Sequence, residues 1–271
     1  MKRYLIYIIN VFYLINILYF FASCEKDIDI DYHESEAVFV VEGSISNTGT
    51  SIRITKTQAM DDNSTSSDIS NAIVVITSND GVNETIPYKE NGFYTSRLIG
   101  TPGTRYQLDI DVDGHHFTSV STMQQMPQLN KFRIVRKDML GENYIFGDIR
   151  IQDILNEDNW YFVHLYRNDK GYRWDVMRDD TNPNKELQQL LGFFREGAND
   201  SDVIHEGDRL HLVVRAIDQR AYDYLYSMER MDDTGTNPIA NFMGGCLGYF
   251  SAYSEVAYDC VFHQAEIENE E

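Results

Sequence analysis

The first candidate for a chemically active site in this chain is a segment in which Asp residues alternate with apolar residues. The sequence DIDVDG at 109–114 reproduces the first half of a calcium-binding loop, in which side chains at every second position ligate the ion. The twelfth position of such a loop needs a bidentate Glu, and here it is Val120. In a β-strand, Asp109 and Asp111 would share the solvent-facing side, and residues 113–114 would form a hairpin turn. We therefore predict a hairpin and no metal site.

Cysteine and histidine offer a second candidate. The sequence GGCLG at 244–248 could present Cys246 as a nucleophile with His263 as its base, although a glycine-rich turn between strands explains it better. None of the seven His forms a metal-binding pair at helical spacing. Motifs of serine hydrolases, zinc proteases and P-loop proteins do not occur. We expect no catalytic residue, no metal and no cofactor, and we expect that the protein is not an enzyme.

Aromatic residues near the C-terminus are the third candidate. Tyr249, Phe250 and Tyr253 could form an exposed platform that stacks on a glycan or a peptide. The alternative is ordinary core packing, which is the common role of aromatic side chains at mixed spacing. The net charge of −20 argues against nucleic acid as a partner, because phosphate binding needs clustered Lys and Arg.

The N-terminal sequence is typical of an export signal. Lys2 and Arg3 precede an apolar stretch that ends at Phe21. The stretch could just span a bilayer, but the basic start, the small residues after it and the lack of a following basic cluster favour a cleaved signal. The sequence FASC at 21–24 resembles a bacterial lipobox, with Phe where Leu is usual. This resemblance implies that Cys24 is acylated, with palmitate among the acyl groups, and becomes the mature N-terminus.

Acidic residues follow Cys24 directly. This stretch resembles the export signals of surface-exposed lipoproteins in Bacteroidota, which implies the outer leaflet of the outer membrane; a plain solvated tether is the alternative. Without residues 1–23 the chain would carry a charge of −22. Cys246 and Cys260 then remain as a candidate disulfide in an exported protein, or as two small buried side chains.

The elements that must position these residues are mostly strands. Apolar and polar residues alternate in short segments, and turn sequences recur about every ten residues, a pattern typical of an antiparallel sandwich. Two helices are expected. Residues 183–192 begin with Pro and end with Gly, and residues 218–231 begin with Asp218 as the N-cap.

The resulting organisation has six parts. We expect a signal peptide (1–23), an acidic tether (24–36), an N-terminal β-sandwich (37–125), a linker (126–130), a C-terminal β-rich domain (131–264) and a solvated acidic tail (265–271). The fold class is mainly β, with an Ig-like or transthyretin-like sandwich followed by a second β-rich domain that carries one or two short helices.

Short motifs in a characteristic order resemble a known family. They are VVEG (40–43), GFY (92–94), PGTRYQL (102–108), VDG (112–114), STM (121–123), GD (207–208), AYDYL (221–225) and LGYFSAYS (247–254). Together they are similar to a Bacteroidota lipoprotein family catalogued as domain-of-unknown-function family 4249. Residues 71–123 also resemble the transthyretin-like sandwich of carboxypeptidase regulatory domains.

This resemblance implies a helper protein and assigns no catalytic residue. It implies an accessory lipoprotein, held in the outer membrane by its lipid and facing the cell surface, beside a TonB-dependent outer-membrane barrel in nutrient uptake. The alternative from the residues is an autonomous surface module that binds a glycan or a peptide.

Overall fold

The computed structural model describes Tyr4 and residues 37–58, 67–152, 154, 157–179, 186–197, 203–231 and 235–270. The expected signal peptide, the lipidation site Cys24 and the acidic tether therefore lie outside the described residues, Tyr4 apart. No helix in the described ranges has both the length and the apolar composition that crossing a membrane requires. Residues 37–271 cluster into one compact unit.

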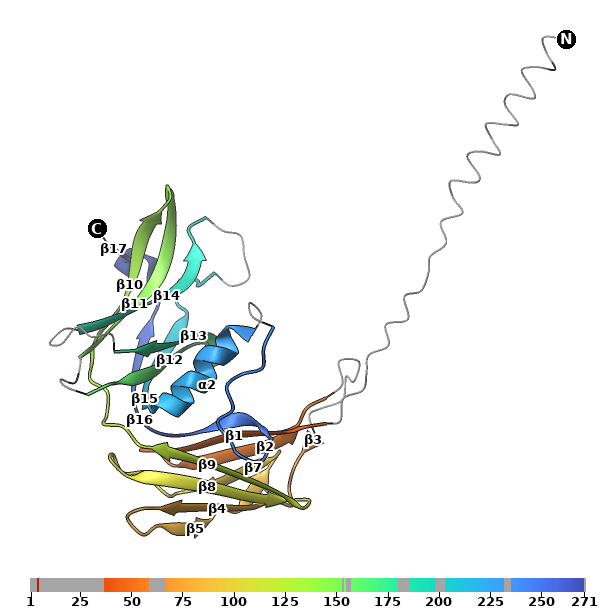
Figure 1. The fold of residues 1–271 in the computed structure, drawn as a ribbon. Coiled ribbons are helices and arrows are strands. Elements are labelled where there is room, and N and C mark those ends of the chain that lie inside the picture. The colour runs from red at the N-terminus through yellow and green to blue at the C-terminus, as the bar shows by residue number, and fades with distance from the viewer. Residues whose placement is uncertain are drawn as a thin grey trace. The chain divides into compact units, whose positions relative to one another are not determined.

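The chain is mainly β, as the sequence predicts, and the described strands form three sheets. The largest sheet has nine strands in the order β13-β12-β15-β16-β1-β2-β7-β6, with β3 beside β2 (Figure 1). These strands are β1 (Phe39–Ser46), β2 (Thr50–Lys56), β3 (Ser67–Asp68), β6 (Tyr88–Glu90), β7 (Phe93–Ser96), β12 (Trp160–Arg167), β13 (Lys170–Arg178), β15 (Arg209–Ile217) and β16 (Leu247–Val261).

Two four-stranded sheets complete the fold, in the orders β5-β4-β8-β9 and β14-β11-β10-β17. The first consists of β4 (Ile73–Ser78), β5 (Asn83–Thr85), β8 (Arg105–Val112) and β9 (His115–Thr122). The second consists of β10 (Leu129–Met139), β11 (Glu142–Gln152), β14 (Glu186–Arg195) and β17 (Glu268–Asn269). A short 3-10 helix, η1 (Gln264–Glu266), precedes β17.

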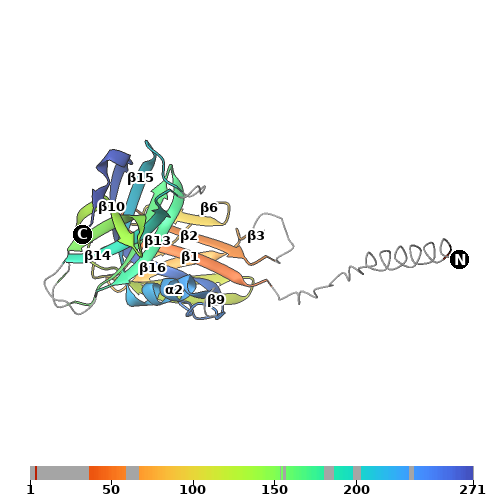
Figure 2. The same ribbon diagram turned by 90° about the horizontal axis from the view of Figure 1, so that it is seen from above.

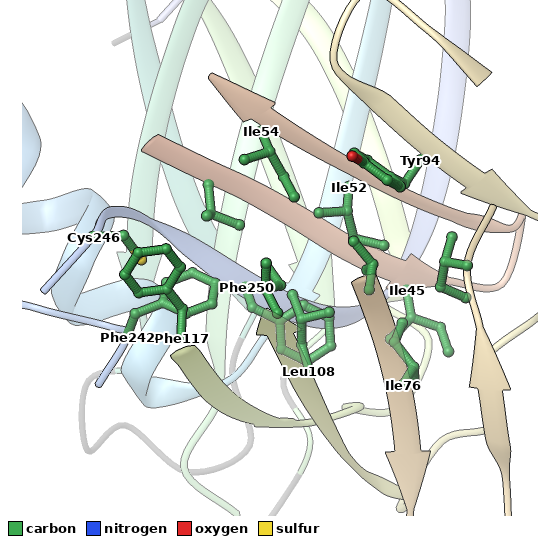
Figure 3. Close-up of a cluster of buried hydrophobic side chains, with 14 of the residues drawn as sticks. Ile45, Ile52, Ile54, Ile76, Tyr94, Leu108, Phe117, Phe242, Cys246 and Phe250 are labelled. Atoms are coloured by element: carbon green, nitrogen blue, oxygen red, sulfur yellow. The ribbon is translucent and has the colours of Figure 1, made fainter. Parts of the chain in front are cut away.

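The first hydrophobic core lies between the β5-β4-β8-β9 sheet and strands β1, β2, β7 and β16 (Figure 3). Alternating residues supply it: Ile52 and Ile54 come from β2, and Leu108 and Ile110 come from β8. Gly43 of β1 allows the sheets to approach, because a Cβ there would lie 3.0 Å from the Leu108 side chain. This is the N-terminal sandwich that the sequence predicts.

The second core lies between the β14-β11-β10-β17 sheet and the other half of the large sheet. Its buried side chains include Ile149 of β11, Val163 of β12 and Leu212 of β15. The opposite face of the large sheet is partly covered by helix α2 (Gln219–Glu229), which lies beside β16 in both views (Figure 1 and Figure 2). The helix starts as predicted, because the Asp218 carboxylate accepts a hydrogen bond from the Ala221 amide.

Strand β16 belongs to both cores. Phe250 and Ala252 point into the first core, whereas Val256 and Cys260, further along the same face, pack against the second. Residues 247–253 pair in parallel with β1, and residues 254–261 pair antiparallel with β15. The expected linker at 126–130 therefore does not separate two independent domains, because side chains from residues 242–252 complete the N-terminal core.

Two expected elements differ from the structure. Residues 186–192 of the expected helix form part of β14, which pairs with β11, while 183–185 lie outside the described residues. Pairing with β11 buries Leu191, and Leu190 turns to the opposite side, as strand geometry requires. The described residues of the expected tail (265–271) are mostly exposed, as predicted, but they are not irregular. Residues 264–266 form η1, and 268–269 form β17, which pairs in parallel with β10.

Candidate functional site

The three aromatics expected to form a platform do not lie on one surface. Phe250 is fully buried in the first core, and Tyr249 and Tyr253 are half-buried on the other face of β16. The Tyr249 ring stacks on Tyr224 of α2 at 5.3 Å, and the Arg215 guanidinium lies 4.9 Å from the Tyr253 ring. Burial raises the pKa of Tyr249 to about 12, against the opposing effect of Arg215. Tyr249 and Tyr253 pack between α2 and the sheet, and Phe250 packs in the core. The structure therefore agrees with the core-packing alternative and not with an exposed platform.

Cys246 and Cys260 are both free, so the candidate disulfide is not formed. Cys246 directly precedes the extended strand β16, and Cys260 is its second-to-last residue. Fourteen residues of strand span roughly 45 Å, whereas bridged Cα atoms lie about 6 Å apart. Burial raises the pKa of the Cys246 thiol to about 12, which disfavours the thiolate that a nucleophile needs. His263, its imagined base, lies beyond the far end of β16, where its Nδ1 lies 2.6 Å from Glu206.

The alternating carboxylates form the predicted hairpin. Strands β8 and β9 are joined by Asp113 and Gly114, both with positive φ, as a two-residue type I′ turn requires. Asp111 lies 2.8 Å from His116 Nδ1 on the paired strand. Among the described residues, no group of three His, Cys, Asp or Glu side chains could hold a metal ion.

The exposed apolar tip of another hairpin is the strongest candidate for a functional surface. Strands β10 and β11 run beyond the neighbouring strands (Figure 1), and every residue from 138 to 143 is exposed. We call residues 138–143 the hairpin tip. Its apex is Leu140, whose side chain is completely exposed, next to the exposed Met139. The Leu140 side chain therefore buries no apolar surface against the described residues.

The backbone conformation at the apex is energetically unfavourable for a leucine. Leu140 has φ +59° and Gly141 has φ +84°, the left-handed pair of a type I′ turn. Three other two-residue turns with this geometry occur among the described residues. They begin with Asn91, Asp113 and Asn168, the residue types that tolerate it. Left-handed backbone costs about 1–2 kcal/mol for an ordinary residue. A strained, fully exposed leucine therefore points to a role outside the fold.

Charged pairs surround the tip. Glu142 accepts a hydrogen bond from Arg195 of β14 at 2.9 Å, and Arg136 binds Glu196 through two nitrogens, at 2.8 and 3.1 Å. A cavity of about 290 Å³ lies beside the tip between these groups. An apolar centre with a polar rim is the usual composition of a protein–protein contact.

A buried ion cluster braces the base of this hairpin. Asp148 of β11 is 0% exposed and accepts hydrogen bonds from Arg133 at 2.7 Å, Arg150 at 2.9 Å and Gln188 at 2.9 Å. Although burial opposes ionisation, these bonds hold the pKa of Asp148 below its usual value. Arg133 also binds Glu268, so the cluster ties β10, β11 and β14 to the C-terminal strand β17. The tip thus stands on a rigid support.

Comparison with known proteins decides the family. The sequence profile described as Domain of unknown function (DUF4249) matches residues 25–259. The chain belongs to the DUF4249 family. No curated protein matches it. Among solved structures, the two fibronectin type-III domain segment from chicken tenascin is similar, with 13% identity, a TM-score of 0.24, and coverage of 84% of this chain and 100% of that one.

The hairpin tip of this DUF4249 chain is a feature that sequence reasoning missed. The signal was present, because Met139 and Leu140 precede a glycine between two alternating segments, where Asn or Asp is the usual choice. The exposed, left-handed position of Leu140 and the cluster beneath it emerge only from the pairing of β10 with β11 and β17.

Proposed function

We propose that this DUF4249 protein is a lipid-anchored outer-membrane accessory protein that faces the cell surface and docks on a TonB-dependent receptor through its hairpin tip, assisting nutrient uptake. The observation that carries the docking part is Leu140, which is exposed and conformationally strained at the apex of a braced hairpin. The lipobox at Cys24 and the likeness to accessory lipoproteins support the location and the class of partner.

The mechanism requires no bond chemistry. A lipid held at Cys24 confines the protein to the membrane surface, and residues 24–36 reach at most about 45 Å when extended. Confinement raises the local concentration of the tip near a receptor, so a weak contact can become a stable one. Leu140 and Met139 then serve as the apolar anchor, and the charged rim aligns it.

The docking experiment compares variants of the tip. An internal affinity tag belongs in the turn at 79–81, because the C-terminal strand β17 pairs with the hairpin itself. After gentle solubilisation of the outer membrane, the wild-type chain should recover a TonB-dependent receptor. Leu140→Asn should lose it, whereas Ile239→Asn, which alters another exposed aliphatic side chain away from the tip, should retain it. Equal recovery by both variants would refute docking through the tip.

The anchoring experiment concerns Cys24 alone. Cells grown with radiolabelled palmitate should label the wild-type chain, and Cys24→Ala should carry no label and leave the outer-membrane fraction. Cys246→Ala is the matched control, since this buried thiol lies in the first core and should not affect labelling. Labelling that survives Cys24→Ala would rule out this anchor.

A further inference from the structure

A row of aromatic rings crosses the large sheet on the face opposite the second core. It runs from Trp174 on β13 through Phe162, His164 and Tyr166 on β12 to His211 on β15. The His164 and Tyr166 rings stack with centroids 4.0 Å apart, and the other neighbours lie 5.8–5.9 Å apart. We call these five residues the aromatic row. Residues two apart on a strand share a face, which aligns three of the rings along β12.

Only one end of the aromatic row is covered by the described residues. Helix α2 packs over Phe162, which is buried, and the half-buried Trp174 packs against the same cluster. His164 and Tyr166 are half-buried and lie outside that cluster. Gly171 is the cross-strand partner of Tyr166, and a Cβ there would lie 3.2 Å from His164 Nε2. Because this position has no side chain, the His164 edge stays open. Across β16, the face continues with the exposed Ala257 and Asp259.

The charges on this face are paired. Arg215 binds Glu255 at 3.0 Å, the His211 ring lies 2.8 Å from Asp259, and Arg209 binds Asp169 at 2.5 Å. His164 is half-buried, and burial together with the neighbouring Arg215 lowers its pKa to about 4, so its ring is neutral at pH 7. A strongly charged ligand would have to break these pairs. A neutral ligand can use their remaining donor and acceptor positions as they stand.

A polar cavity lies at the open end of the row. It has a volume of about 240 Å³ and is lined by the ends of β15 and β16 and by Asp169 of the β12–β13 turn. His211 and Asp259 belong both to the cavity wall and to the end of the aromatic face. Flat apolar rings beside a small set of polar groups form the usual composition of a small-ligand site.

We propose that the aromatic row and the adjoining cavity bind a neutral oligosaccharide. The C–H groups of the sugar rings would pack against the exposed edges of the stacked Tyr166–His164 pair and against the accessible part of Trp174. Sugar hydroxyl groups would bond to His211, Asp259 and Arg209. This inference goes beyond docking, since it concerns another face of the fold and different residues. It also differs from the earlier platform, because its rings come from β12, β13 and β15 and not from β16.

The test uses neutral linear hexasaccharides of glucose, xylose and mannose as probes, at concentrations up to 5 mM, with binding followed by calorimetry. At least one probe should bind the full mature chain. Tyr166→Ala and Trp174→Ala should each weaken binding about tenfold, because each removes an apolar ring that the sugar contacts. Tyr88→Ala is the control, because Tyr88 is an exposed tyrosine on β6, at the other end of the large sheet.

A second variant guards against misfolding. Gly171→Val adds a side chain over the His164 edge at a strand position that favours branched residues, so binding should fall while the melting temperature holds. Absence of binding to every neutral probe, binding that these variants leave unchanged, or binding only of anionic sugars or peptides would overturn the proposal. Leu140→Asn should keep its sugar affinity, which separates this test from that of docking.

Discussion

Leu140 occupies a backbone position that three other hairpin turns fill with Asn or Asp. The substitution Leu140→Asn should therefore stabilise the fold by about 1 kcal/mol, because Asn tolerates left-handed backbone and no described contact is lost. Urea unfolding monitored by circular dichroism measures the change. Lower stability in the variant would mean that the leucine packs within the chain, contrary to an outward role.

Gly248 is needed where β16 meets β1. A Cβ at this position would lie 1.9 Å from the Val41 carbonyl oxygen, and φ is +101°. Gly248→Ala should therefore destabilise the fold by about 3 kcal/mol or more, since strain and a backbone clash add. Gly81→Ala separates the two causes, because Gly81 has φ +105° and open space around it. Equal losses for the two variants in urea unfolding would contradict the clash.

At the scale of elements, Asp148 links the stability of the hairpin to pH. Its pKa is lowered in the folded state, so its contribution to stability is present above the unfolded value near 4 and is lost as the pH falls through the folded pKa. Asp148→Asn should cost about 2–3 kcal/mol at pH 7, because it leaves Arg133 and Arg150 without their buried carboxylate.

The measurement is amide exchange in β10 and β17, together with urea unfolding at pH 7 and pH 3. The difference between wild type and Asp148→Asn should shrink at the lower pH, because Asp148 of the unfolded chain binds a proton below about pH 4 while the folded carboxylate resists protonation. Glu142→Gln is a suitable control, since its pair with Arg195 is half exposed and should have little effect. A pH-independent difference would mean that shape, and not charge, accounts for the loss.

Local sequence patterns predicted elements correctly where the structure depends on neighbouring residues alone. The Asp113–Gly114 turn and the Asp218 cap were correct, because turn and cap chemistry depend on adjacent residues. The segment 186–192 was misassigned because Leu187, Leu190 and Leu191 also fit one side of a helix. Pairing with β11 overrides this local preference, and no local pattern contains that information. The aromatic row was missed for a similar reason, since its rings come from three strands.

At the scale of the whole molecule, β16 explains why a single domain boundary at 126–130 was a poor prediction: this C-terminal strand completes the N-terminal sandwich. Val40 pairs with Leu247, and such a contact between distant residues leaves no trace in local periodicity. The N-terminal core lacks Phe250 and Ala252 when the chain is cut at residue 130. A fragment of residues 37–130 should therefore fail to fold cooperatively.

Complementation tests this dependence. Adding a peptide of residues 241–256 should restore strand signal in circular dichroism and a melting transition to the fragment, because the peptide supplies the missing strand. The same peptide with Phe250→Asp is the control, since it places a charge at a fully buried position. A fragment that melts cooperatively without any peptide would show that the N-terminal sandwich is self-sufficient.

The place of β1 in the large sheet also has a mechanical consequence. The chain enters β1 directly at Phe39, and β1 pairs with β16 on one side and β2 on the other. Tension applied from residue 37 acts along the strand and therefore across both rows of hydrogen bonds, which are perpendicular to it on the β2 side and slanted on the β16 side. It therefore loads these bonds in shear, all at once, and does not peel them apart in succession. A protein pulled by a membrane anchor while its far end holds a moving partner would resist extraction at this strand.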